Sequence, residues 1–325
     1  MKNMHLNQSQ KGLTLIEIMI AMTISLVLLA GIIQIFLSSK QSYNIQQALS
    51  RVQENARLVT DIVLRDITAA GYMGCLGATD NVINTLADQT ANYDYATAIE
   101  GSEGGAGNPD SITIRRVVEG MSIPVVEPMT NGTASIKLDT TNLNYASLKQ
   151  WDVVTVSDCA GAAVFMITND PAASSGVIEH DAGVDATSGI NQGQSNTTVD
   201  LKRIFGSQTA TTAKIYRVSS TSYQVLPSES GRTTSLYISG NELVEGVENL
   251  QIEYGIANGP PTASAPTIAE QYVDANAVTD WNNVMAVRLT FIVNSGDMIV
   301  NPGDGDGRLR KTFSTTIRLR NRVPA

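Results

Sequence analysis

One long apolar stretch determines where this chain can reside. Residues 13–37 read LTLIEIMIAMTISLVLLAGIIQIFL, and Glu17 is the single charged residue among them. As an α-helix rising about 1.5 Å per residue, the stretch would extend roughly 37 Å, whereas the hydrocarbon core of a bilayer is about 30 Å thick. The sequence therefore predicts a transmembrane segment over residues 13–37.

The residues that flank this stretch predict its orientation. Lys2 and Lys11 precede it, which favours an N-terminus in the cytoplasm and places everything after Lys40 on the other side of the membrane. A cleaved secretory signal peptide is the alternative interpretation. Three features argue against a signal peptide: the stretch is long for its hydrophobic region, it contains a carboxylate, and its pattern continues into a further helix.

Glu17 needs an explanation, because an acidic side chain near the centre of a membrane helix costs roughly 2.5–3.5 kcal/mol, and less toward the helix end. One interpretation is a tolerated charge that reaches the membrane interface. The other is a partner charge that neutralises it. Cleavage between Gly12 and Leu13 would create a new amine four residues from Glu17, and a neighbouring subunit could supply the same group.

The segment KGLTLIE, from Lys11 to Glu17, resembles the processing site of type IV prepilins, in which a prepilin peptidase cuts after the glycine and methylates the new N-terminus. The resemblance implies that residues 1–12 are the leader, that Leu13 is the first mature residue and that Glu17 is the assembly glutamate. The family usually has phenylalanine where this chain has Leu13. Both residues are large and apolar, so cleavage is still expected.

A helical pattern continues beyond the transmembrane segment. Six apolar residues follow one another at spacings of 4, 3, 4, 3 and 4, which is typical of an amphipathic helix: Ile45, Leu49, Val52, Ala56, Val59 and Val63. Gly71 is a plausible stop, since glycine enters the left-handed conformation without penalty. We expect one helix over residues 13–70, with two helices broken near Ser38 as the alternative.

The remainder, residues 71–325, reads as one head domain built from short strands. Nine runs are rich in β-branched and aromatic residues: 112–118, 134–138, 152–157, 164–168, 214–218, 235–238, 250–254, 284–293 and 312–319. Three further segments read as long loops: 101–109, 172–193 and 257–269. No amphipathic helices alternate with the strands, so parallel crossovers are not expected. The predicted fold class is α+β, a long N-terminal helix packed on a mainly antiparallel β-sheet head.

The chain has two cysteines, Cys75 and Cys159, and two histidines. This inventory excludes zinc sites of the Cys/His type, and no cofactor is expected. Since the transmembrane segment places the head outside the cytoplasm, where disulfides persist, we expect the two cysteines to form a bridge. Two free buried thiols are the alternative.

Acidic residues outnumber basic ones by 31 to 22, which gives a net charge of −9. Such a chain repels a phosphate backbone, which argues against a general nucleic-acid-coating role. The C-terminal end is locally basic. Arg318, Arg320 and Arg322 alternate, so they would share one face of a terminal strand. That face could pair with carboxylates of neighbouring strands, or it could dock on an acidic partner subunit or on extracellular DNA.

Asp304 and Asp306 occur in the sequence DGDG, which is similar to a fragment of a calcium loop. An EF-hand requires a bidentate glutamate at its twelfth position, and that position counted from Asp304 is Thr315. A tight turn is therefore the preferred interpretation, and ion binding at these two residues stays open.

Several later segments resemble the PilW-like minor pilins of type IV pili. They are the segments AGYMGC (70–75), VSDC with VF (156–165), LVEGVENL (243–250), Trp281 with VRL (287–289), and TTIRLRNR (315–322). The resemblance implies a low-abundance subunit that joins other minor pilins in a tip complex that primes the fibre. The expected partners are the prepilin peptidase, other minor pilins, the major pilin and the inner membrane. The head would be periplasmic before assembly and on the cell-surface pilus afterwards.

Two other functions compete with this one. A minor pseudopilin of a type II secretion system would share the leader, the anchor and Glu17. A membrane-anchored enzyme with a Ser-His-Asp site would have to use His180, the histidine that remains after leader removal. Its neighbours Glu179 and Asp181 are adjacent in sequence rather than arranged as an orienting shell, and no nucleophile elbow or phosphate-binding loop accompanies it. We therefore expect no enzymatic activity.

Overall fold

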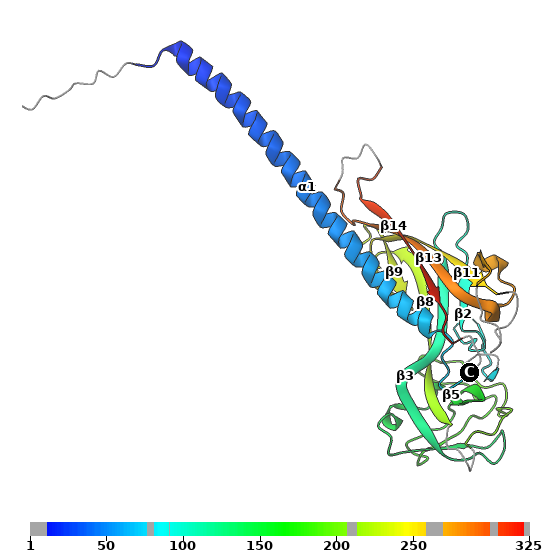
Figure 1. The fold of residues 1–325 in the computed structure, drawn as a ribbon. Coiled ribbons are helices and arrows are strands. Elements are labelled where there is room, and N and C mark those ends of the chain that lie inside the picture. Colours follow the sequence, from blue (N-terminus) through cyan, green and yellow to red (C-terminus); the bar gives the residue numbers. More distant parts are fainter. Residues whose placement is uncertain are drawn as a thin grey trace, which may run out of the picture. The chain divides into compact units, whose positions relative to one another are not determined.

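The computed structural model describes residues 12–76, 81–90, 92–206, 213–257, 269–299 and 305–321. Within them the chain forms two compact units. The first contains residues up to Arg51 together with Asp297–Leu309, and the second contains Val52–Gly296 together with residues from Arg310 onward. The second unit corresponds to most of the expected head. Figure 1 shows the secondary structure of both units.

A single continuous helix, α1 (Leu15–Ala69), belongs to both units. It continues through Ser38 and Ser39, so the alternative of two helices is wrong. Gly71 follows its end with φ of 73°, and its N–H donates to the carbonyl of Arg115 at 2.9 Å. The predicted glycine stop is therefore confirmed: the left-handed turn directs the chain into the head.

The second part of α1 carries the predicted apolar stripe, which is buried from Val52 onward. Val52, Ala56, Val59, Val63, Ile67 and Ala70 are all at most 4% exposed. The prediction is wrong for the first two members of the stripe. Ile45 is half-buried and Leu49 is 37% exposed, while Ala48 is buried instead. The burial of the stripe fixes α1 to the head from Val52 to Ala70.

A ten-stranded sheet forms much of the second unit, in the order β1-β6-β5-β8-β3-β4-β7, with β2 paired to β3, β9 to β8 and β10 to β9. Its strands are β1 (Val82–Asn84), β2 (Ile99–Ser102), β3 (Ser111–Glu127), β4 (Ile136–Leu138), β5 (Val153–Asp158), β6 (Gly161–Met166), β7 (Val177–Ile178), β8 (Lys214–Pro227), β9 (Thr234–Ile238) and β10 (Asn241–Glu245). The long strands β3 and β8 pair with each other and connect its two ends (Figure 1).

A four-stranded antiparallel sheet completes the second unit, in the order β12-β11-β13-β14. Its strands are β11 (Val247–Ile256), β12 (Gln271–Val273), β13 (Val284–Asn294) and β14 (Arg310–Arg318). Short 3-10 helices lie in connecting segments, among them Tyr145–Ser147, Ala275–Ala277 and Trp281–Asn283. The buried side chains of α1 share one core with residues of both sheets, among them Tyr223 and Phe291.

The predicted fold class is confirmed, with one correction to the strand pairing. All nine predicted strands overlap observed ones, but β1 pairs with β6 in parallel. Five short strands were not predicted: β1, β2, β7, β10 and β12. The two residues of β7 lie inside the predicted loop 172–193, and β2 overlaps the start of the predicted loop 101–109. Most of the predicted loop 257–269 lies outside the described residues.

Candidate functional site

The predicted processing site lies at the start of α1 and is fully accessible. Gly12 is exposed, and a Cβ added to it would meet no other atom within 4 Å. Leu13 is 77% exposed. A peptidase that has to approach the backbone at this bond therefore meets no obstruction from the described part of the chain.

Glu17 forms a capping box with Thr14 at the N-terminus of α1. The Glu17 carboxylate accepts hydrogen bonds from the Thr14 N–H at 3.0 Å and from the Thr14 hydroxyl at 2.9 Å. The Glu17 N–H donates to the Thr14 hydroxyl oxygen at 3.4 Å. Such a reciprocal pair satisfies N–H groups that the first turn of a helix leaves without partners. Sequence analysis missed Thr14, although the spacing T-x-x-E is a known sign of this cap.

The first part of α1 exposes its apolar side chains on all sides. Leu15, Ile16, Met22 and Leu26 are each at least 65% exposed, and the best 18-residue window of the helix has a mean hydropathy of 2.5 with none of it buried. By length and composition this helix can cross a membrane. So much exposed apolar surface is typical of a segment that meets lipid or another protein.

Asp66 connects α1 to the ten-stranded sheet. The residue is 8% exposed, and its carboxylate forms an ion pair with Arg116 on β3 at 3.1 Å and accepts a hydrogen bond from the Tyr223 hydroxyl on β8 at 2.7 Å. Burial and the Asp66 carboxylate both raise the pKa of the Tyr223 phenol, so this hydroxyl keeps its proton and donates. The helix is thus held by a polar anchor as well as by its apolar stripe.

The predicted disulfide between Cys75 and Cys159 is confirmed, so the alternative of free buried thiols is wrong. Cys75 lies in the turns that follow α1, and Cys159 lies in the turn between β5 and β6, with their Cα atoms 4.8 Å apart. The bridge closes a loop with a sequence separation of 84 residues. In the chain-entropy model a loop of this size contributes about 4.6 kcal/mol to the free energy of unfolding.

The predicted basic stripe lies at the end of β14, on the edge of the four-stranded sheet. Arg318 and Arg320 are exposed, while the alternating residues Ile317 and Leu319 are buried, as the alternation predicted. In the described part of the chain neither arginine has a carboxylate within ion-pair distance, so pairing with neighbouring strands is not observed. Both line a cavity of about 440 Å³ beside Leu64 and Thr68 of α1. Arg322 lies outside the described residues.

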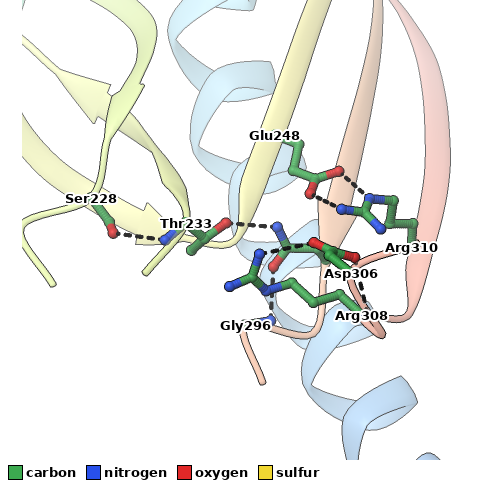
Figure 2. Close-up of polar contacts among 8 residues, drawn as sticks. Ser228, Thr233, Glu248, Gly296, Asp306, Arg308 and Arg310 are labelled. Carbon is green, nitrogen blue, oxygen red and sulfur yellow. Dashed lines mark hydrogen bonds and ion pairs between the residues drawn. The ribbon is translucent and has the colours of Figure 1, made fainter. Parts of the chain in front are cut away.

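Other arginines near the C-terminus do pair with carboxylates (Figure 2). Arg310 donates through Nε and Nη2 to both oxygens of Glu248, at 2.6 and 2.7 Å. The side chain of Arg308 donates to Asp306 at 2.9 Å, and the Arg308 N–H donates to the same carboxylate at 3.2 Å. The Asp306 carboxylate therefore bonds within its own turn. Asp304, the other residue of the possible ion site, lies outside the described residues.

His180 lies in the core rather than in a catalytic arrangement. It is 2% exposed, its ring packs on Phe165 with centroids 5.1 Å apart, and its Nε2–H donates to the carbonyl of Ala134 at 3.1 Å. Burial lowers the pKa of the imidazole. The neighbouring Asp181 carboxylate accepts from the Thr168 hydroxyl at 3.3 Å instead of orienting the ring. The position of His180 is that of a neutral core residue.

Two protein families match parts of this chain. The family described as "Type IV Pilus-assembly protein W" matches residues 207–321, and the family described as "Prokaryotic N-terminal methylation motif" matches residues 7–33. The first range contains β8 to β14, and with them the resembling segments 243–250 and 287–289. The segments 70–75 and 156–165 lie outside both matched ranges. The second range contains the predicted processing site and Glu17.

Comparison with solved structures finds a type IV-like pilin from Thermus thermophilus. The match has 12% sequence identity, covers 84% of this chain and 98% of that chain, and has a TM-score of 0.31, which is too low to establish a shared fold. No curated protein sequence matches the chain.

The two family matches lie in the order expected along the chain, one at the transmembrane end and one over the C-terminal half of the head. The N-terminal motif implies processing by a prepilin peptidase, membrane anchoring and assembly with other pilins. Pilins are structural subunits rather than enzymes. In agreement with that, His180, the histidine that a catalytic triad would need, is buried in the core. The matches, the long apolar helix and the disulfide-bridged head together support a PilW-like minor pilin of the type IV prepilin superfamily.

Proposed function

We propose that this protein is a minor pilin that joins a tip complex which primes assembly of a type IV pilus. Cleavage after Gly12 releases the leader, α1 anchors the subunit in the inner membrane, and the head lies in the periplasm until the subunit enters the fibre. The observation that carries the proposal is the combination of an accessible Gly12, an exposed apolar helix and a C-terminal part of the head, residues 207–321, that matches the pilus-assembly family.

The same N-terminal features are expected of a pseudopilin in a type II secretion system. The match over residues 207–321 favours the pilus branch, because it concerns the head rather than the shared N-terminal helix. For an enzyme, no observation on the described residues offers support, and the buried position of His180 argues against a triad that uses it.

In the assembled state, Glu17 would neutralise the amine created at Leu13, in the same subunit or in a neighbour. The capping box shows what the carboxylate does in the single chain: both of its contacts are to Thr14, at an exposed helix end. Transfer of the helix into an apolar fibre core would remove water from the carboxylate. A cation beside it would then matter more, since an unpaired charge is costly in a low-dielectric environment.

Processing tests the first step of this proposal. Intact-mass measurement of the mature protein should give an N-terminus at Leu13 that carries one added methyl group. Replacement of Gly12 by a bulky residue should leave the precursor in the membrane, because a side chain would block approach to the backbone. A functional subunit that keeps Met1, or one that begins beyond Ala30, would contradict the prepilin assignment.

The basic stripe of Arg318 and Arg320 is proposed as a docking surface for an acidic partner subunit. Replacement of both by alanine should weaken capture of the partner minor pilins from solubilised membranes and leave the head folded, since both side chains are exposed. Arg57, whose side chain is 84% exposed on α1, supplies the matched control. Equal loss with Arg57→Ala, or no loss with the double variant, would reject this surface.

A further inference from the structure

A polar cavity lies in the head, where the ten-stranded sheet is incomplete. Strand β8 pairs with β3 along one side, while its other side pairs with β5 over residues 214–217 and with β9 over residues 223–227. Among the described residues no strand pairs with residues 218–222 on that second side. Figure 1 shows β9 beside the upper part of β8 and β5 near its lower part. A cavity of about 420 Å³ lies at this gap.

Backbone groups of β8 point into the gap. In an antiparallel sheet the N–H and C=O of one residue face the same neighbour, and successive residues alternate sides. The carbonyl of Ser222 accepts from the Ser239 N–H at 2.8 Å, and the Ser222 N–H donates to the Ser239 hydroxyl at 3.4 Å. The alternation then directs the backbone groups of Ser220 toward the same side, where the cavity lies.

The Ser220 hydroxyl is a second sign of a missing ligand. Its oxygen is buried and has no hydrogen-bond partner in the described chain, and Ser220 is one of the residues that line the cavity. A buried polar group without a partner costs about 1–3 kcal/mol. A ligand in the cavity would remove this cost once the Ser220 side chain turns its hydroxyl toward it.

The lining is rich in hydroxyl and amide groups and carries no net charge. Its charged residues, Asp152 and Arg217, form an ion pair with each other at 3.4 Å. The other polar side chains are four serines, two asparagines and two tyrosines: Ser219, Ser220, Ser222, Ser239, Asn92, Asn191, Tyr93 and Tyr95. This composition fits a neutral ligand with many hydroxyl groups, since each partner can donate or accept.

The cavity also offers apolar contacts and a fixed wall. Ile190 at its rim is 91% exposed, and the half-buried ring of Tyr93 lies in the lining. The Tyr93 hydroxyl donates to the Asn191 side chain at 3.2 Å, and the Asn191 amide donates to the carbonyl of Trp151 at 2.8 Å. The cavity wall is thus preorganised, and its volume is in the lower part of the range usual for small-molecule sites, about 300–1,000 Å³.

We propose that this cavity binds one or two rings of a neutral saccharide. Sugar hydroxyls would bond to the serine hydroxyls and to the backbone N–H and C=O of Ser220, and the apolar C–H face of a ring would lie against Tyr93 and Ile190. An extended peptide that adds a strand to β8 is the competing ligand. The gap fits a peptide less well than a saccharide. The gap is only five residues long between β5 and β9, and it is lined by hydroxyl groups rather than by pockets for alternate side chains of a peptide.

The test uses the full-length protein in a zwitterionic detergent without a sugar headgroup, and saturation-transfer difference NMR with glucose, galactose, mannose, N-acetylglucosamine, lactose and maltose. At about 10 mM sugar, a site with a dissociation constant of about 1 mM is mostly occupied. At least one sugar should give a signal. Ser220→Val should weaken its binding about tenfold, because one hydrogen bond is lost.

Ile190→Ala should weaken binding about threefold through lost apolar contact. Its side chain is exposed, so this variant decides the question if Ser220→Val does not fold. Ser314→Val, on an exposed strand position, and Leu143→Ala, at a side chain that is 96% exposed, are the matched controls and should bind as the unmodified protein does. The proposal fails if no sugar binds, if both cavity variants bind normally, or if an extended peptide binds here and no sugar displaces it.

Discussion

The two parts of α1 have the same helical period and opposite surroundings. From Leu15 to Leu37 the apolar side chains occupy every face and are exposed, whereas from Val52 to Ala70 one stripe of apolar side chains is buried, and each of its members is at most 4% exposed. The difference follows from the pattern of polar residues. In the first part Glu17 is the single charge, while in the second Arg57 and Asp61 pair with each other on the solvent face at 3.7 Å. A helix that is apolar all round needs lipid or protein as its environment, and an amphipathic one needs a core.

The comparison predicts that equal substitutions in the two parts have unequal effects on the head. Ile67→Ala removes a fully buried side chain and should lower the free energy of unfolding by about 3 kcal/mol, because it leaves a cavity. Ile24→Ala, at a side chain that is 56% exposed, should change it by less than about 0.5 kcal/mol. Thermal or urea unfolding of the full-length protein in detergent, followed by near-ultraviolet circular dichroism, measures both. Equal losses would show that the two parts of α1 are not energetically distinct.

A smaller effect should appear with pH, and it should belong to the head alone. Burial lowers the pKa of His180 in the folded state below its usual value of about 6.5, so the unfolded chain binds a proton first as the pH falls. The stability that the neutral, buried His180 contributes to the head is present above the unfolded pKa and is lost on acidification. The loss begins as the pH falls through the unfolded pKa of about 6.5 and is complete below the lowered pKa of the folded state.

The direct check is an NMR titration of the His180 ring in the protein without its leader, where it is the remaining histidine. Its midpoint should lie below 6.5. A midpoint at or above this value would contradict the burial of a neutral ring and remove the predicted loss of stability.

Features of the sequence that act locally could be predicted, and those that depend on distant partners could not. The apolar stretch, the stripe from Val52 and the Gly71 stop follow from spacing along one helix, and the Thr14 cap of Glu17 could have been found in the same way. The contacts of Asp66 could not be predicted from the sequence, since its partners Arg116 and Tyr223 are 50 and 157 residues away along the chain. Sequence alternation placed Arg318 and Arg320 on one exposed face, but it could not reveal that no carboxylate of the described residues pairs with either of them.

The short strands were missed for the same physical reason. β1 and β12 have three residues each. They are strands because they pair with β6 and β11, and not because they contain a run of β-branched residues. The cavity beside Ser220 likewise depends on where β5 and β9 end against β8, which no local pattern encodes. Register across a sheet is a property of the assembled fold.

The account rests on the claim that Glu17 serves assembly rather than membrane insertion or head stability. The most direct measurement is surface piliation in cells that carry Glu17→Leu or Glu17→Gln, with all other subunits intact and the membrane level of each variant determined by blotting. Leucine removes a costly charge, so insertion should be normal or improved. Glutamine keeps the shape but not the charge, so both variants should reach normal membrane levels and form fewer pili. Full piliation with either variant would contradict the claim.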